Sequence, residues 1–312
     1  MKQVAKIWIL VMAMVMGGAL PPQVTGDNAI ATQWCAQAKS KNKHKKKSKK
    51  KPRKSSQPKK YGFPDKSSLL SVPTIGKATS TTVPQQNTKA LLAVSIPKGV
   101  ANQVLNYQSI RVNFNPSLRI PNCVAYELTA TMVDMADAPG HESRKNYNYA
   151  RDNGVKSCPE NWEYRGSGYS RGHMAPAMDM RWDKTAMAQC FYMTNMCPQD
   201  TKLNNDHWRM LEEKVHRWAK RDKRIMVFTG PVMGKTPKMI GKDKQNIAVP
   251  DAFFKVLYAP AQGRAIAFIY PNKPCPGGIS KYAVTVAEVE RRTGLTFSNA
   301  IPKRQCRIED WE

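Results

Sequence analysis

The stretch Tyr164-Arg-Gly-Ser-Gly-Tyr-Ser-Arg-Gly-His-Met-Ala-Pro176 holds the densest group of reactive side chains in the chain. Two segments follow it closely: Met193-Thr-Asn-Met-Cys-Pro-Gln199 and Leu203-Asn-Asn-Asp-His-Trp-Arg-Met-Leu-Glu212. Hydrolysis of a phosphodiester needs a base to activate water, a cation to neutralise the phosphoryl oxygens, and guanidinium groups to hold the phosphate. These three segments offer a candidate for each role.

His173 directly follows Arg171 and Gly172. A glycine beside a histidine lets the backbone approach a ligand closely, and the neighbouring arginine can serve the same site. We therefore interpret His173 as a candidate base. The alternative, an ordinary core or surface histidine, is the commoner role of a single histidine and stays open at this point.

Asn204 and Glu212 lie in an amphipathic pattern. Asn204 is either a helix N-cap, a common role of asparagine, or an oxygen ligand for a hard cation such as Mg²⁺. Glu212 follows eight residues later, which is about 80° around a continuous α-helix. That offset favours contact between Glu212 and the waters of a metal over direct ligation. The alternative for Glu212 is a solvated helix face with Arg209 or His216.

The surrounding sequence predicts an α+β fold. One helix is expected at about 205–220, because large apolar residues recur there at helical spacing, namely Trp208, Leu211, Val215 and Trp218. A second helix is expected at 282–292. Apolar and β-branched runs predict strands at 123–129, 225–229, 246–249, 252–258 and 265–270. Sheets with segregated helices indicate a single domain.

Together the motifs resemble the DNA/RNA non-specific endonucleases, the ββα-metal (His-Me finger) group that includes mitochondrial endonuclease G. The resemblance covers about residues 120–270 in order and spacing. It rests on Tyr164-Arg-Gly-Ser-Gly, Ser170-Arg-Gly-His173, Thr194-Asn-x-x-Pro-Gln199, Leu203-Asn204, Trp208, Leu211-Glu212, Thr229-Gly-Pro231 and Val249-Pro-x-x-Phe-Phe-Lys255. It implies a central antiparallel sheet flanked by helices.

The resemblance also implies a role for each candidate. His173 would be the general base, and Asn204 the only side chain that holds the Mg²⁺ directly. Glu212 would orient the hydrated metal, and Mn²⁺ or another divalent cation is an alternative to Mg²⁺. Arg171 would lie near the phosphate. Arg144 would be the upstream transition-state arginine, with nearby Arg151 as the alternative.

Three further positions belong to the same motifs. Asn195 and Gln199 would brace the site by hydrogen bonds. Ser170 departs from the family pattern, which begins Asp-Arg-Gly-His, whereas this chain has a serine in the first place. A serine hydroxyl would orient its neighbours without charge, so we expect activity or its pH dependence to differ while cleavage persists.

The composition points to a polyanionic partner. The 312 residues carry a formal net charge of +27, and residues 39–60 hold 13 Lys or Arg and no acid. Subtracting these and the +1 of residues 1–38 leaves +13 on residues 61–312. This charge favours nucleic acid first and an anionic membrane surface second. With 41% hydrophobic and 23% charged residues, wholesale disorder, a coiled coil and a multi-span membrane protein are excluded.

Three segments are predicted along the chain. Residues 1–26 have two lysines, an apolar run and a small-residue end, which indicates a removed signal peptide and hence export to the periplasm or the exterior. Residues 27–100 are expected to be a disordered arm and linker. Residues 101–312 would form the endonuclease domain. Within the arm, 39–60 is either a spacer or an electrostatic tether to nucleic acid or an anionic envelope.

Export would permit disulfides among the seven cysteines, and Cys275 with Cys306 is the preferred pair.

The sequence thus predicts an exported, Mg²⁺-dependent, sugar-nonspecific endonuclease that cleaves DNA and RNA and leaves 5′-phosphate ends. Because the base must be neutral, activity should fall as the pH drops through the pKa of His173, near 6.5 when unperturbed. One alternative is a non-catalytic exported nucleic-acid-binding protein on a nuclease-like scaffold. A third reading is a surface adhesin acting through 39–60. Monomer and homodimer are both left open.

Overall fold

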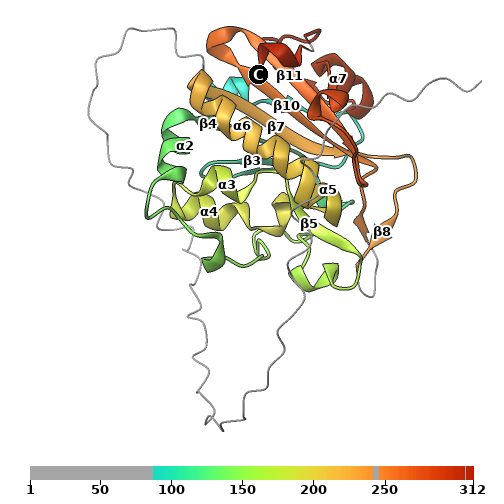
Figure 1. Cartoon of the computed structure of the whole chain (residues 1–312). Helices are drawn as coiled ribbons and strands as arrows, with labels where there is room; N and C mark the ends of the chain where they lie inside the picture. The colour runs from blue at the N-terminus through green and yellow to red at the C-terminus, as the bar shows by residue number, and fades with distance from the viewer. Residues whose placement is uncertain (1–86, 242–245, 306) are drawn as a thin grey trace, which may run out of the picture. The chain divides into compact units, whose positions relative to one another are not determined.

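The computed structural model describes residues 87–241, 246–305 and 307–312, and it is built around a seven-stranded sheet (Figure 1). The strand order is β12-β11-β10-β7-β4-β3-β2, and every neighbouring pair is antiparallel. The strands are β2 (Gln103–Asn106), β3 (Arg111–Asn115), β4 (Ile120–Thr129), β7 (Arg224–Val232), β10 (Ala252–Ala259), β11 (Arg264–Pro271) and β12 (Ala283–Val284). Three small sheets pair β1 (Val94–Ser95) with β13 (Thr296–Phe297), β5 (Tyr169–His173) with β6 (Met196–Asp200), and β8 (Met239–Ile240) with β9 (Ile247–Ala248).

The helices are mostly short. The α-helices are α1 (Thr88–Leu91), α2 (Ala130–Asp137), α3 (Ala177–Met180), α4 (Lys184–Cys190), α5 (Thr201–Leu203), α6 (Arg209–Asp222) and α7 (Val286–Thr293). Between α5 and α6 lies a π-helical turn, η5 (Asn204–Trp208). The 3₁₀ turns are η2 (Arg144–Asn146), η3 (Asn161–Tyr164), η4 (Met193–Asn195), η6 (Pro260–Gln262), η7 (Ile279–Tyr282) and η8 (Ile308–Asp310). Within the described ranges, no helix combines the length and the apolar character needed to span a bilayer.

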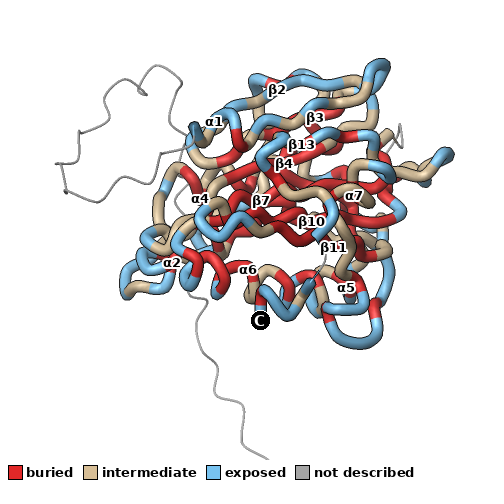
Figure 2. The backbone as a smooth tube through the Cα atoms, turned by 90° about the horizontal axis from the view of Figure 1, so that it is seen from above, coloured by how far each residue is buried: buried red, intermediate tan, exposed pale blue. Residues whose placement is uncertain are grey.

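The central strands are buried on both faces, which explains their continuous apolar runs. On β10, Phe253 and Leu257 belong to the core on the α6 side, whereas Phe254 and Val256 belong to the core on the α7 side. Trp218 of α6 stacks on Phe268, with ring centroids 6.4 Å apart. Figure 2 shows the buried strands β7 and β10 with α6 along one side of them. The helices therefore cover both faces of the sheet.

The predicted α+β class, with a central antiparallel sheet flanked by helices, is confirmed. The predicted strand at 246–249 forms β9 of a small separate sheet. The helix predicted at 282–292 starts only at Val286, because a 3₁₀ turn and β12 occupy the preceding residues. The domain limits remain predictions, but the end of the predicted disordered arm 27–100 is ordered: it forms α1 and β1, because Leu91 is buried in the core and β1 pairs with β13. The first described element starts at Thr88, and the predicted signal peptide 1–26 and most of the predicted arm lie outside the described residues.

Candidate active site

Most of the candidate residues lie on two paired strands and the helix that follows them. β5 pairs antiparallel with β6, with His173 opposite Met196. Helical structure begins directly after β6, because the Asp200 carboxylate accepts hydrogen bonds from the N–H groups of Lys202 and Leu203, both at 2.9 Å. His173 therefore ends β5, and Asn204 lies in the first turns of the helix in the same unit. Figure 1 shows β5 near α5, beside the face covered by α6.

His173 lies in an aromatic pocket and is 8% exposed. Its ring centroid is 5.0 Å from that of Phe191 and 5.6 Å from that of Tyr149. Nε2 is buried and has no hydrogen-bond partner among the described residues. Burial, and after it the positive charge of Arg144, lowers the pKa of His173 to about 3. The imidazole is therefore neutral near neutral pH, as a general base requires, and the value near 6.5 expected from sequence does not apply.

Arg144, and not Arg151, shares the surroundings of His173. The Arg144 Nη2 donates to the Tyr149 hydroxyl at 3.0 Å, and its Cζ lies 5.1 Å from the Phe191 ring centroid. Arg151 instead donates to the carbonyls of Cys158 and Lys156, at 2.8 and 2.7 Å. Arg144 thus supplies charge beside the histidine, while Arg151 closes a loop.

Arg171 is held without a carboxylate. Its Nη2 donates to the Asn161 carbonyl at 2.7 Å, and its Cζ lies 5.3 Å from the Tyr149 ring centroid and 5.5 Å from that of Tyr164. In the described part of the chain, no ion pair neutralises this guanidinium. Its positive charge is therefore available to a phosphate.

Asn204 presents an open oxygen. Its amide nitrogen donates to Asn205 Oδ1 at 3.2 Å, and the Asn204 Oδ1 receives no hydrogen bond from the described residues. Asp200 is the cap of this helix, so the capping alternative for Asn204 is wrong. A carboxamide oxygen with no competing donor suits a hard cation that keeps most of its waters.

The π-helical turn removes the angular offset expected between Asn204 and Glu212. A π turn accommodates one extra residue, so positions i and i+8 across it behave like i and i+7 of an α-helix. Positions i and i+7 lie on the same face. The two side chains therefore share a face of the helix.

Glu212 does not belong to a solvated ion-pair face. Arg209 pairs with Glu213, and His216 pairs with Asp179 and Asp137. Burial raises the pKa of Glu212, and the positive charge of Lys255 opposes this effect. The Lys255 side chain is fully buried on β10, and its Nζ donates to Thr229 Oγ1 at 2.9 Å. Sequence reasoning assigned no role to Lys255, although a charge between Phe253 and Leu257 on one strand face was a visible signal.

A second buried polar network lies behind the site and was also missed. The Asp179 carboxylate, 1% exposed, accepts from the Tyr126 hydroxyl at 2.7 Å and contacts His216 Nδ1 at 3.0 Å. His216 Nε2 contacts Asp137 Oδ1 at 3.2 Å. Burial acts to lower the pKa of His216, but these carboxylates outweigh it and raise the pKa. The network joins β4, α2, α3 and α6.

The two buried histidines should titrate in opposite directions. In an NMR titration of the metal-free protein, the His173 ring should stay neutral down to about pH 5, because its pKa is lowered to about 3. His216 should be more than half protonated at about pH 6.5, because its pKa is raised above the ordinary value. Protonation inactivates a base as the pH falls through its pKa, so any loss of activity caused by His173 itself lies well below 6.5. His173→Ala and His216→Ala assign the signals, and a His173 resonance with its midpoint near 6.5 would contradict the expectation.

Three residues brace the strands around the histidine. Asn195 is fully buried; its amide donates to the carbonyls of Ala175 and Cys190 at 2.9 and 2.8 Å and accepts from the Ala175 N–H at 3.0 Å. The Ser170 hydroxyl lies 3.0 Å from that of Thr201 and so links β5 to the helix start. The buried Gln199 side chain supports the site only by packing on Gly172: its amide atoms have no hydrogen-bond partner among the described residues, so the hydrogen bonds predicted for Gln199 are not formed.

Gly172→Ala should separate β5 from β6. A Cβ at this position would lie 2.3 Å from Gln199 Oε1 and 2.6 Å from Gln199 Cβ. Glycine is needed here because the Gln199 side chain leaves no room for a Cβ. We expect a loss of about 1–3 kcal/mol in the free energy of unfolding and a marked loss of DNA cleavage, measured by thermal unfolding and by a nuclease assay. Gly278→Ala is the control, because its Cβ would have no neighbour closer than 3.8 Å; equal effects of the two changes would refute this account.

The residues present fit a hydrated divalent cation. Asn204 Oδ1 is open, and the buried polar atoms Nε2 of His173 and Oε1 of Gln199 have no partner among the described residues. Within these residues, no three His, Cys, Asp or Glu side chains gather as a metal-binding group. A cation at Asn204 would therefore be held by one side-chain oxygen and by waters, the arrangement that Mg²⁺ tolerates well.

Comparison with known proteins agrees with this geometry. Residues 87–304 match the model of the family described as DNA/RNA non-specific endonuclease. Nuclease 1, mitochondrial, from Schizosaccharomyces pombe is 30% identical over 240 residues, which cover 70% of this chain and 72% of the relative. Human endonuclease G, mitochondrial, is 33% identical over 51% of this chain and 58% of its own length. Nuclease C1 from Cunninghamella echinulata var. echinulata is 31% identical over 68% of this chain and 88% of the relative.

A solved structure shares the fold. One chain of the crystal structure described as the EndoG/EndoGI complex superposes on this protein with a TM-score of 0.61 and 26% sequence identity. The superposed region covers 71% of this chain and 95% of the chain in that structure.

The prediction of an exported protein is wrong. Several of the most similar relatives carry mitochondrial names, which points to mitochondria and away from the periplasm or exterior. Among the described residues, Cys123, Cys158, Cys190, Cys197 and Cys275 are all buried free thiols. Cys275, half of the preferred disulfide, is one of these thiols, and Cys306 lies outside the described residues.

The family match spans most of the chain and coincides with the ββα unit that carries His173 and Asn204. The chain therefore belongs to the DNA/RNA non-specific endonuclease family and is a metal-dependent endonuclease.

Proposed function

We propose that this endonuclease hydrolyses phosphodiester bonds in both DNA and RNA with Mg²⁺ and leaves 5′-phosphate ends. One observation carries the proposal: a buried, neutral His173 with an unpartnered Nε2 lies in the same ββα unit as Asn204 with its open oxygen. Contacts to phosphate position a nucleic acid without reading its sequence. A site built from arginines and a hydrated cation would therefore accept either sugar.

The side chains divide the chemistry between them. His173 Nε2 accepts a proton from the attacking water, since its ring is neutral. Arg171 and Arg144 hold and offset the negative charge of the phosphate. Glu212 lies on the same helix face as Asn204 and would accept hydrogen bonds from ordered waters. A Mg²⁺ held by Asn204 would stabilise the charge that develops on the phosphoryl and leaving oxygens.

Ser170 fits this proposal as a neutral linker. Its hydroxyl contacts Thr201 at the start of the helix, so it orients β5 against the helix by a hydrogen bond and without charge. None of the proposed roles of base, metal ligand or phosphate clamp depends on this residue.

The test uses the full chain and a chain lacking residues 39–60. Each is incubated with plasmid DNA and with RNA, in Mg²⁺, in Mn²⁺ or in EDTA. Both nucleic acids should be cut only with a divalent metal, and the DNA fragments should be substrates for a ligase that requires 5′-phosphate and 3′-hydroxyl ends. The truncated chain should keep its turnover and lose affinity most at low salt, because charged tethers are screened by salt. Tight binding without cutting under any metal would instead support a non-catalytic nucleic-acid-binding protein.

A further inference from the structure

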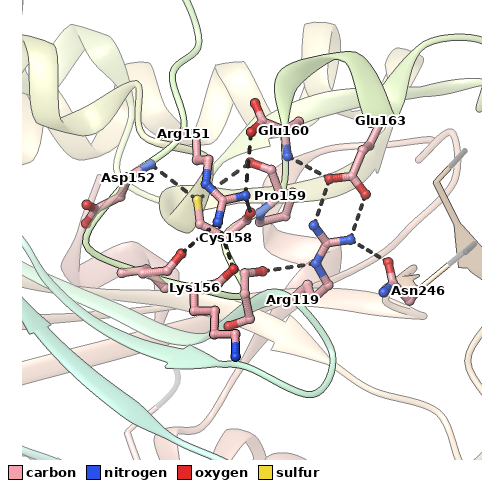
Figure 3. Close-up of polar contacts among 11 residues, drawn as sticks. Arg119, Arg151, Asp152, Lys156, Cys158, Pro159, Glu160, Glu163 and Asn246 are labelled. Atoms are coloured by element: carbon pink, nitrogen blue, oxygen red, sulfur yellow. Dashed lines mark hydrogen bonds and ion pairs between the residues drawn. The ribbon is translucent and has the colours of Figure 1, made fainter.

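Two arginines outside the proposed chemistry organise the loop that precedes β5 (Figure 3). Arg151 donates to the carbonyls of Lys156 and Cys158, and it lies 3.5 Å from a carboxylate oxygen of Glu160. Arg119 holds the next part of the same loop. Its backbone φ of 57° is left-handed, which is uncommon for a residue other than glycine.

The contact between Arg119 and Glu163 is a two-pronged ion pair. Nη1 and Nη2 of Arg119 donate to the two carboxylate oxygens of Glu163 at 2.6 and 2.7 Å, and Nε donates to the Ser157 carbonyl at 3.0 Å. The side chains are only 13% and 8% exposed. Such a paired geometry fixes orientation as well as distance. Glu163 also accepts from the Glu160 N–H at 2.7 Å, so the carboxylate fixes the whole 3₁₀ turn η3.

The same turn holds Arg171 from its other side. The Asn161 carbonyl accepts from Arg171 Nη2 at 2.7 Å, and the Tyr164 ring lies under the guanidinium. These two contacts come from the first and last residues of η3, and Glu163 lies between them. Any shift of the turn would therefore move the support of Arg171, which has no ion-pair partner of its own within the described residues.

We propose that Arg119 and Glu163 are positioning residues that hold Arg171 in place for a substrate phosphate. The inference rests on the proposed function only in taking Arg171 as a phosphate contact. The loop links a turn of the central sheet, where Arg119 connects β3 to β4, to the strand that carries His173. The sheet thereby sets the position of a guanidinium that lies outside it.

The test is a double-variant cycle of Glu163→Gln with Arg171→Ala. Affinity for a labelled DNA duplex is measured by fluorescence anisotropy in EDTA, and kcat and KM are measured on the same duplex with Mg²⁺. Glu163→Gln alone should weaken affinity and raise KM by about 3- to 10-fold, with a smaller change in kcat. In the Arg171→Ala background, Glu163→Gln should change neither the affinity nor KM, because the guanidinium that Glu163 positions is absent. Arg119→Lys keeps the positive charge but cannot form the two parallel hydrogen bonds to the Glu163 carboxylate, so it should have the same effect as Glu163→Gln. It replaces Glu163→Gln in the double-variant cycle if that variant does not fold.

A purely structural role gives a different result. Glu163→Gln would then weaken the affinity and raise KM by the same factor with and without the Arg171 guanidinium. This outcome would overturn the proposal. Glu127→Gln is the matched control, because it removes an ion pair to Arg224 in which both side chains are 24% exposed. It should lower the unfolding temperature and leave affinity and KM unchanged. Cleavage by the wild type tests the proposed function separately, since the affinity cycle in EDTA can be read even if no DNA is cut.

Discussion

His173→Ala is expected to lower the rate of DNA cleavage by about 10²–10⁴-fold, the usual contribution of a positioned general base. His173 has a neutral imidazole ring, and its buried Nε2 has no hydrogen-bond partner among the described residues. The rings that pack against it belong to Phe191 and Tyr149, which carry neither a carboxylate nor an imidazole to replace it as the base. The change should appear in kcat on a duplex substrate at saturating Mg²⁺, while affinity for DNA in EDTA stays close to that of the wild type.

The control for this variant is His141→Ala. His141 is exposed, and its Nδ1 contacts only the carbonyl of Ala138 in its own loop, at 3.0 Å. It should cleave DNA like the wild type. Thermal unfolding of both variants separates lost chemistry from lost folding, and undiminished cleavage by a folded His173→Ala protein would remove His173 from the role of base.

Asn204→Ala is expected to lower cleavage by at least about 10²-fold, because stabilisation of developing charge by a metal is worth several kcal/mol. Asn204 Oδ1 is the open oxygen on the helix face shared with Glu212, so its removal should weaken the binding of the cation itself. The measurement is the dependence of the rate on Mg²⁺ concentration. The half-saturating concentration should rise, and high Mg²⁺ should restore part of the activity.

Asn205→Ala provides the matched comparison. Asn205 is the same residue type at the next position, and its side-chain oxygen accepts a hydrogen bond from the side-chain amide of Asn204. Its loss removes a support for Asn204 but leaves the oxygen, so a much smaller effect is expected. If the two alanine variants show the same Mg²⁺ dependence, the metal is not held by Asn204.

The fold could be predicted from the sequence where the pattern is local. The long strands β4, β7, β10 and β11 follow from their apolar runs, and the helix around Trp208 and Trp218 follows from its spacing. Short elements could not be predicted, because β5, β12 and β13 have few residues and depend on pairing with distant partners. Location was predicted wrongly, since a short apolar N-terminal run says little about the compartment by itself.

For the site, sequence identified the residues but not their surroundings. The motifs pointed to His173, Asn204 and Arg144, and the structure groups His173 with Arg144 and places Asn204 in the adjoining helix. The acidic pKa of His173 could not be predicted, because it arises from burial against Phe191 and Tyr149, two residues that lie far apart in the chain. The reason for Gly172 was also hidden, because the side chain that requires it belongs to the neighbouring strand.

The π-helical turn makes the length of one segment as important as its composition. Asn204 and Glu212 share a face because residues 204–208 hold one residue more than an α-helical turn. Deleting a single residue there would leave a regular α-helix in which the two positions are seven apart and still share a face, whereas inserting one more residue would turn Asn204 by about 100° away from Glu212. Substitutions at the exposed positions of this turn should be tolerated. A further insertion should not, so a designer who lengthens this helix must keep Asn204 and Glu212 on one face.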